Sequence, residues 1–210
     1  MRDDVAAALA SIDHPVVDAL DVFCGTRPYD ELLPEGCRSV GLDIDDRWGA
    51  ADVVSDEFLP FDDDSFDLVM CFEAFYYVQD SRHGVAEIDR VLKPGGTVLI
   101  TVPHVWEYDR TTFEHRFTEP ALAALFEDWD DVRVVENGGR GVAWATLTGR
   151  LLSSLQANLP RRVRPILGPA FGLAFFAINA LGAQIERLDR RVPGRYRLPM
   201  NLMLTARSTP

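Results

Sequence analysis

Short apolar runs rich in β-branched residues recur through the first half of the chain and constrain its fold most. They are too uniformly apolar for strands with one solvated face, so we expect central strands covered on both sides. Helical stretches separate them, which predicts an α/β fold with a parallel sheet and right-handed crossovers. The runs are VVDALDVF (16–23), CRSVGLDI (37–44), AADVVS (50–55), FDLVMCF (66–72) and TVLITVP (97–103).

Helical spacing of apolar residues marks two of the intervening stretches, RPYDELL (27–33) and RHGVAEIDRVL (82–92). Two further strands are expected near the end, VRVVEN (132–137) and MNLMLTAR (200–207), with an unusually long connection between them. A length of 210 residues suits one α/β domain. We therefore predict a single domain over 1–210 that contains a helical, apolar and basic insertion at 141–199.

Charge is distributed unevenly along the chain. The formal net charge is −12, but residues 1–149 hold 31 acidic and 11 basic residues, whereas residues 150–210 hold 2 acidic and 10 basic ones. Acidic surface over most of the chain argues against a nucleic-acid partner. Three cysteines without metal-like spacing suit reduced thiols and predict no metal site, and the first residues do not read as a signal peptide. We expect a cytoplasmic protein.

The stretch LDVFCGTRPYDELL (20–33) follows the first predicted strand and opens the first predicted helix. Backbone N–H groups and a helix dipole would converge there on a ligand. Asp43 lies 22 residues after Asp21, where an acid can accept hydrogen bonds from both hydroxyls of a ribose. After Gly25 the next glycine is Gly36, so the third glycine of the dinucleotide fingerprint is missing and a nicotinamide oxidoreductase is disfavoured.

Several motifs occur in an order that resembles the class I S-adenosylmethionine-dependent methyltransferases, specifically a small bacterial type. They are LDVFCGTRPY, GLDID, LPFDDDSFDLVMCFEAFYYV, EIDRVLKPGGTVLITVPH and RFTEPAL, and together they cover roughly residues 16–140. The resemblance implies a Rossmann-like, seven-stranded methyltransferase sheet that is mostly parallel, with the last strand antiparallel. The helical insertion would then lie between the last two strands.

The same resemblance implies the cofactor S-adenosylmethionine and the residues that would hold it. At its methionine end the implied residues are Asp21, Phe23, Cys24, Gly25 and Thr26. Asp43 would bind the ribose, and Ile44 would pack on the adenine. Asp56 and Glu57 would approach the adenine edge, and Cys71 and Glu73 would close the pocket.

Phe23 departs from the family, which has a glycine at this place so that backbone can approach the cofactor without a Cβ. The ring could pack away and leave a working pocket, or it could fill the pocket. Arg27 is a smaller departure, because the subgroup with RPY commonly carries a side chain there.

Methyl transfer needs alignment and, for a hydroxyl acceptor, a base. Glu73, Tyr77, His104 and His115 lie beyond predicted strand ends, and we take His104 and Glu73 as the catalytic candidates. The resemblance suggests a small-molecule or lipid-linked glycan acceptor. A degenerate methyltransferase fold that acts as a non-catalytic scaffold is the alternative.

The segment ILGPAFGLAFFAINALGA (166–183) carries no charge and is flanked by arginines on both sides. One interpretation is a helical cap packed on the domain. The other is contact with an anionic membrane surface through 160–197, with aromatic residues buried and arginines at the headgroups. We predict peripheral membrane association through this segment.

Overall fold

The computed structural model describes residues 1–55, 59–189 and 198–209. The chain divides into two compact units. The first comprises Met1–Pro103, Tyr108–Val135 and Leu202–Pro210, and the second comprises His104–Glu107 and Glu136–Asn201. Each is described below by itself.

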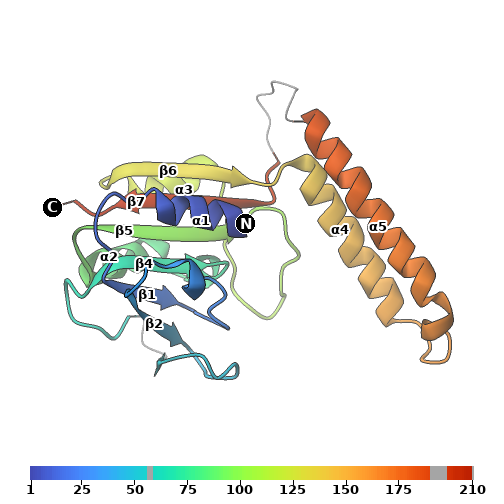
Figure 1. Cartoon of the computed structure of the whole chain (residues 1–210), viewed down its shortest axis with the longest axis horizontal. Coiled ribbons are helices and arrows are strands. Elements are labelled where there is room, and N and C mark those ends of the chain that lie inside the picture. The colour runs from blue at the N-terminus through green and yellow to red at the C-terminus, as the bar shows by residue number, and fades with distance from the viewer. Residues whose placement is uncertain (56–58, 190–197, 210) are drawn as a thin grey trace. The chain divides into compact units, whose positions relative to one another are not determined.

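A seven-stranded sheet with the order β3-β2-β1-β4-β5-β7-β6 forms the centre of the fold (Figure 1). Each predicted strand is present, and the fifth begins earlier than expected. The strands are β1 (Asp18–Val22), β2 (Arg38–Asp43), β3 (Val53–Val54), β4 (Phe66–Phe72), β5 (Leu92–Pro103), β6 (Asp130–Asn137) and β7 (Asn201–Arg207).

Strands β1 to β5 pair in parallel, whereas β7 runs against β5. Ser208, after the end of β7, donates its N–H to the carbonyl of Gly96 near the start of β5. Met200, before the start of β7, accepts from the N–H of His104 after the end of β5. The predicted mostly parallel sheet with an antiparallel last strand is confirmed.

Both faces of the sheet are covered by helices, as the uniformly apolar strands predicted. Along β4, Val69 joins a core with α2 (Ser81–Val91) and α3 (Glu119–Ala123), while its neighbours Leu68 and Met70 join a second core with α1 (Arg2–Ala10). Because successive strand residues point to opposite faces, one strand supplies both cores. Because β1 pairs in parallel with β2 and with β4, the carboxyl ends of these three strands lie together at one edge of the sheet.

The helix expected over 27–33 is wrong. Only a three-residue 3-10 turn, η1 (Asp30–Leu32), forms there. Arg27 before it has a φ of +53°, outside the helical region, and Pro34 after it cannot continue a helix. So short a turn has little dipole, so the helix dipole predicted to converge on a ligand here is absent.

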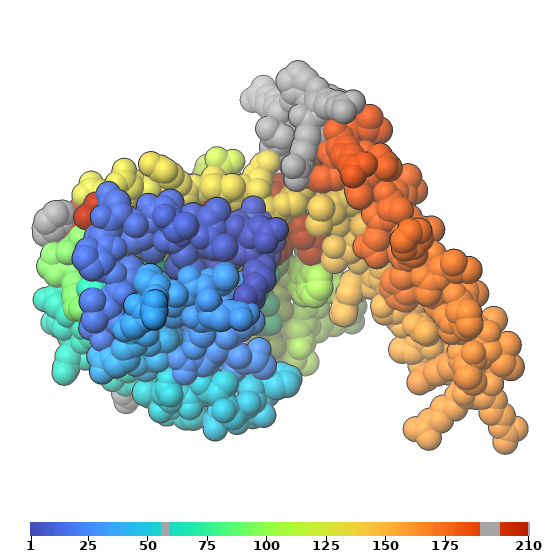
Figure 2. Space-filling model, in the orientation of Figure 1, coloured from blue at the N-terminus to red at the C-terminus, as the bar shows by residue number. Residues whose placement is uncertain are grey.

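The second unit is a hairpin of two helices, α4 (Arg140–Ala157) and α5 (Arg164–Asp189). The backbones approach closely near one end, because a Cβ added to Gly141 would lie 2.3 Å from the carbonyl oxygen of Gly182. Figure 2 shows the two helices side by side, with α5 in orange to red. The helical insertion predicted between the last two strands is therefore present. Arg190, Arg191, Arg195 and Arg197, used in predicting the membrane surface, lie outside the described residues.

Candidate active site

The turn after β1 holds three alternate residues in the left-handed region. Phe23, Gly25 and Arg27 have φ values of +57°, +54° and +53°. A side chain in this region costs about 1–2 kcal/mol, whereas glycine adopts it freely. Phe23 and Arg27 therefore have a backbone conformation that only glycine would adopt without strain.

Arg27 is held in place by a set of contacts on β2 and its neighbours. Its guanidinium lies 2.7 Å from Asp30 Oδ2 and 2.6 Å from Asp52 Oδ2, and it donates to the Ser39 carbonyl at 2.8 Å. Asp52 also accepts from the Gly41 N–H at 2.8 Å. These bonds offset the strain of a left-handed arginine and tie the turn to β2.

A cavity of about 250 Å³ opens beside this turn, at the carboxyl ends of β1 and β4. Six of the predicted site residues line it, and three further residues were missed. The predicted ones are Asp21, Phe23, Cys24, Gly25, Thr26 and Glu73, and the missed ones are Pro28, Tyr29 and Phe72. The rings of Tyr29 and Phe72 pack with centroids 4.3 Å apart. Pro28 and Tyr29 belong to the RPY motif, which was the available signal for these two residues.

Phe23 combines both arrangements considered from the sequence. It lines the cavity and is also packed against the larger core cluster. Cys71 differs from the expectation, because its side chain is 1% exposed within that core and is not among the lining residues. Phe72, the next residue along β4, takes the place expected for Cys71.

One buried and one partly buried carboxyl give the cavity its electrostatic character. Asp21 is 2% exposed, and burial, reinforced by the charge of Asp30, raises its pKa to about 8. Burial also raises the pKa of Glu73, against a hydrogen bond from Thr101 that lowers it. Desolvated acids of this kind favour a cationic ligand that would restore their charge. Burial raises the pKa of the Cys24 thiol to about 11, so it stays neutral.

Glu73 is positioned by the strand that follows. Its backbone φ is +53°, and its N–H donates to the Thr101 carbonyl at 2.9 Å and to Thr101 Oγ1 at 3.0 Å. Strained backbone that is over-determined by its neighbours is typical of functional sites.

Asp43 stands at the end of β2 and joins the turn to that strand. Its Oδ2 accepts from the Gly25 N–H at 2.9 Å and its Oδ1 from the Ile44 N–H at 2.8 Å. Ile44 is 59% exposed, an apolar surface next to the acid. Asp56 and Glu57, expected near the adenine edge, lie outside the described residues.

The histidine and tyrosine candidates occupy different surroundings. His104 belongs to the second unit, where its N–H donates to the Met200 carbonyl at 2.9 Å. His115 Nε2 lies 3.1 Å from the Gln79 carbonyl oxygen, and Tyr77 packs on Tyr76 with ring centroids 4.1 Å apart. Their catalytic roles stay predictions. Among the described residues, no three His, Cys, Asp or Glu side chains gather as a metal site would require.

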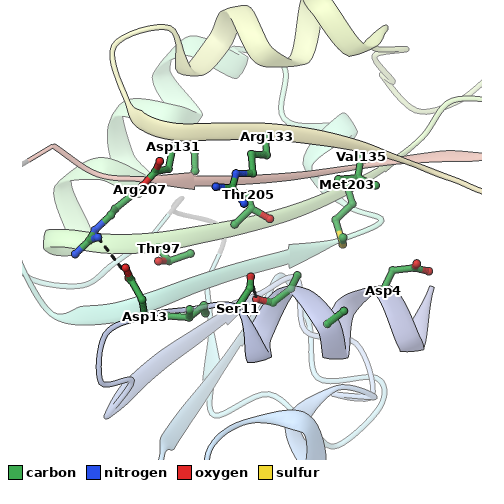
Figure 3. Close-up of a pocket in the computed structure, with 14 residues that line it drawn as sticks. Asp4, Ser11, Asp13, Thr97, Asp131, Arg133, Val135, Met203, Thr205 and Arg207 are labelled. Carbon is green, nitrogen blue, oxygen red and sulfur yellow. Dashed lines mark hydrogen bonds and ion pairs between the residues drawn. The ribbon is translucent and has the colours of Figure 1, made fainter.

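A larger cavity, of about 380 Å³, lies on the face of the sheet between α1 and strands β5 to β7 (Figure 3). Its walls carry acids and bases together, among them the pair Asp13 and Arg207, 3.4 Å apart. None of the predicted site residues lines this cavity.

Comparison with known proteins finds methyltransferases. Residues 20–100 match the methyltransferase domain family. A demethylmenaquinone methyltransferase of Clavibacter sepedonicus is 52% identical in a 128-residue alignment that covers 51% of this chain and 51% of that protein. A phthiotriol/phenolphthiotriol dimycocerosates methyltransferase of Mycobacterium ulcerans is 31% identical over 131 residues, 62% of this chain and 42% of that protein. The chain thus spans about half the length, or less, of these curated relatives.

A solved structure shares the fold across almost the whole chain. A SAM-dependent methyltransferase from Archaeoglobus fulgidus aligns over 99% of this chain and 94% of its own, with a TM-score of 0.57 and 19% identity. Its likeness concerns the fold, and the domain match concerns residues 20–100. Together with the strand order, these two likenesses show a Rossmann-like methyltransferase fold.

Proposed function

We propose that the protein transfers a methyl group from S-adenosylmethionine to a small-molecule or lipid-linked acceptor. The observation that carries the proposal is the cavity at the strand ends, which the left-handed turn, Asp21 and Glu73 line together. S-adenosylmethionine bears a sulfonium and an ammonium group. The two desolvated carboxyls fit a ligand with these two positive charges.

The remaining parts of the cofactor also find chemically suited groups. Asp43 already accepts the Gly25 N–H, and its free lone pairs are suited to ribose hydroxyls. The exposed Ile44 would cover one face of the adenine, and the resemblance assigns Asp56 and Glu57 to the adenine edge. These four assignments are part of the proposal.

The chain's own residues have three tasks in the reaction. The sulfonium methyl is already a good electrophile, so the turn and its acids mainly hold the cofactor in one orientation. Glu73, with its raised pKa, is suited to accept a proton from a hydroxyl acceptor, and His104 is the second candidate base. Exclusion of water by Tyr29 and Phe72 would keep the carboxyls desolvated.

The acceptor is proposed to be lipid-like. The relatives from Clavibacter sepedonicus and Mycobacterium ulcerans are named for demethylmenaquinone and for phthiotriol dimycocerosates. A lipid-linked glycan, the class suggested by the sequence, belongs to the same physical category of membrane-anchored acceptors. Such an acceptor implies a cytoplasmic enzyme that works at a membrane surface.

Calorimetric titration tests the cofactor half of this proposal, with S-adenosylmethionine, S-adenosylhomocysteine and NAD as ligands. We expect both adenosyl compounds to bind and NAD to give no heat. A second assay would follow radiolabelled methyl transfer into demethylmenaquinone and into a bacterial lipid extract. If neither adenosyl compound gives heat or a thermal shift at millimolar concentration, the proposal fails. The alternative, a non-catalytic scaffold, would then be favoured.

A further inference from the structure

Helix α5 exposes an apolar surface along most of its length. The 21 residues 165–185 carry no charge. Only 6% of the residues in the most apolar stretch of the helix are buried. Leu173 and Phe176, in the middle of the helix, are 71% and 74% exposed. Single exposed apolar residues are ordinary, but a continuous stripe of this length marks an interaction surface.

Helix α4 adds a second stripe. Trp144, Leu147, Leu151 and Leu155 recur at three- and four-residue spacing, so they share one side of the helix, and all are partly or largely exposed. By helical geometry this stripe lies beside the contact with α5. The hairpin therefore presents apolar residues of both helices.

A second flank of α4 carries polar residues. Thr146 lines a groove there with Asn179, Glu186 and Arg187 of α5, among the small or apolar residues Val142, Ala145, Gly182 and Ala183. By helical spacing, Ser153 follows Thr146 on this flank. On α4 the apolar stripe and the polar flank therefore lie on different sides of the helix.

Basic residues bracket the apolar stretch. Arg161, Arg162 and Arg164 lie at the turn between the helices, and Arg187 lies in the last turn of α5. The turn arginines are exposed, and Arg164 also donates to the Leu159 carbonyl at 3.0 Å, which fixes the turn. Positive charge next to exposed apolar surface is complementary to an anionic lipid surface.

We propose that the α4–α5 hairpin lies in the plane of an anionic bilayer, with its apolar stripes in the interface and its arginines among the headgroups. The inference extends the proposed function, whose lipid-like acceptor it would bring within reach, but membrane binding itself requires no methyl transfer. The length of α5 would also allow it to cross a bilayer.

Two observations favour the in-plane arrangement over spanning. Arg150 lies in the middle of α4, paired with Glu107 at 2.7 Å and stacked over Trp106, and a spanning hairpin would carry this charge into hydrocarbon. The close contact of Gly141 with Gly182 also makes the two helices one unit, so α5 would not enter the membrane without α4.

Vesicle flotation of the full chain tests the proposal. We expect the protein to float with vesicles that contain phosphatidylglycerol and to remain unbound with phosphatidylcholine alone. High salt should release it, because screening removes the attraction of the arginines. Replacing Arg161 and Arg162 by glutamine should weaken binding by about fivefold for each residue.

Matched variants compare the apolar stripe of α4 and the exposed apolar residues of α5 with the polar flank of α4. Leu151→Gln with Leu155→Gln, and Leu173→Gln with Phe176→Gln, should each lower vesicle binding at least tenfold. Thr146→Gln with Ser153→Gln, on the polar flank, should leave it unchanged. All these positions are at least partly exposed, and far-UV circular dichroism with melting temperatures would verify that each variant folds.

Fluorescence provides a second readout. Brominated lipid should quench Trp144, so Trp144→Phe should lose most of the quenching. Trp48→Phe, which removes a tryptophan 63% exposed in the first unit, should retain it.

The proposal would be overturned by an absence of flotation at low salt, or by equal flotation of the apolar-side and polar-side variants. Retention on vesicles at high salt would indicate a spanning helix instead. A dimer that the apolar-side variants convert to monomer, without any vesicle binding, would indicate a protein interface instead. Calorimetry with S-adenosylmethionine on the same preparation separates this from the proposed function. Cofactor binding without flotation would remove the membrane surface alone, and flotation without cofactor binding would remove the enzyme alone.

Discussion

Gly25 donates its backbone N–H to Asp43 Oδ2 at 2.9 Å, and this bond joins the turn after β1 to the end of β2. The carboxylate therefore holds the turn before any ligand arrives. If it also binds the ribose, one side chain both shapes the site and contacts the ligand. Changes at Asp43 should then lower both cofactor affinity and stability.

Asp43→Ala should weaken S-adenosylmethionine binding by about 2 kcal/mol, the scale of hydrogen bonds to a charged group. Calorimetry measures the change. Asp45→Ala, which removes the nearby acid paired with Arg47, is the matched control and should leave affinity unchanged. Equal losses in both variants would indicate a general charge effect instead of a ribose contact.

Phe23→Gly and Phe23→Ala separate backbone strain from ring packing. Both remove the ring, but only glycine accommodates a φ of +57° without strain. The glycine variant should therefore be more stable than the alanine variant by about 1 kcal/mol in chemical denaturation. It should also bind cofactor more tightly than the wild type, because the ring lines the cavity. An alanine variant as stable as the glycine variant would mean that the left-handed backbone relaxes.

Asp21 should make stability and cofactor binding depend on pH. With a pKa of about 8 when folded and 3.8 as its ordinary value, the folded protein holds a proton that the unfolded chain has lost between these pH values. Stability from this group is complete below pH 4 and declines by up to about 1.4 kcal/mol per pH unit as pH rises toward 8. Asp21→Asn should lack this decline. Its melting temperature should therefore increase relative to that of the wild type as pH rises.

Cofactor affinity should follow the opposite course. A cationic ligand prefers ionised Asp21, so wild-type affinity should rise as pH approaches 8, and Asp21→Asn should flatten that profile. Calorimetry in buffers of different ionisation enthalpy would count the proton released on binding. No proton release near pH 7 would contradict an interaction of the ligand with Asp21.

Gly182→Ala should destabilise the α4–α5 hairpin by about 1–3 kcal/mol, because the new Cβ would lie 2.6 Å from the Cβ of Ala145. Gly172→Ala, elsewhere on α5, meets no atom within 4 Å and should stabilise the helix by roughly 0.5–1 kcal/mol. Thermal melts followed by circular dichroism compare the two. A neutral Gly182→Ala would show that the helices are not held at this crossing.

The sequence predicted the sheet well because its strands are buried on both faces, which leaves a uniform apolar signal in FDLVMCF and TVLITVP. It wrongly predicted a helix over 27–33, where helical spacing was outweighed by Pro34 and by the ion pair of Arg27 with Asp52, a residue distant in sequence. Cys71 was placed on the cavity wall by the family resemblance, but its side chain points into the core. The pairing of Tyr29 with Phe72 joins different segments and was not visible in either.

The left-handed Phe23 also has a consequence for selective inhibition. Where a glycine would leave bare backbone, this cavity has an aromatic ring along part of its wall. A ligand built to stack on that ring would gain contact area here and lose it in a methyltransferase that keeps the glycine. The substitution that makes the turn hardest to recognise is thus the one that would make its pocket easiest to distinguish.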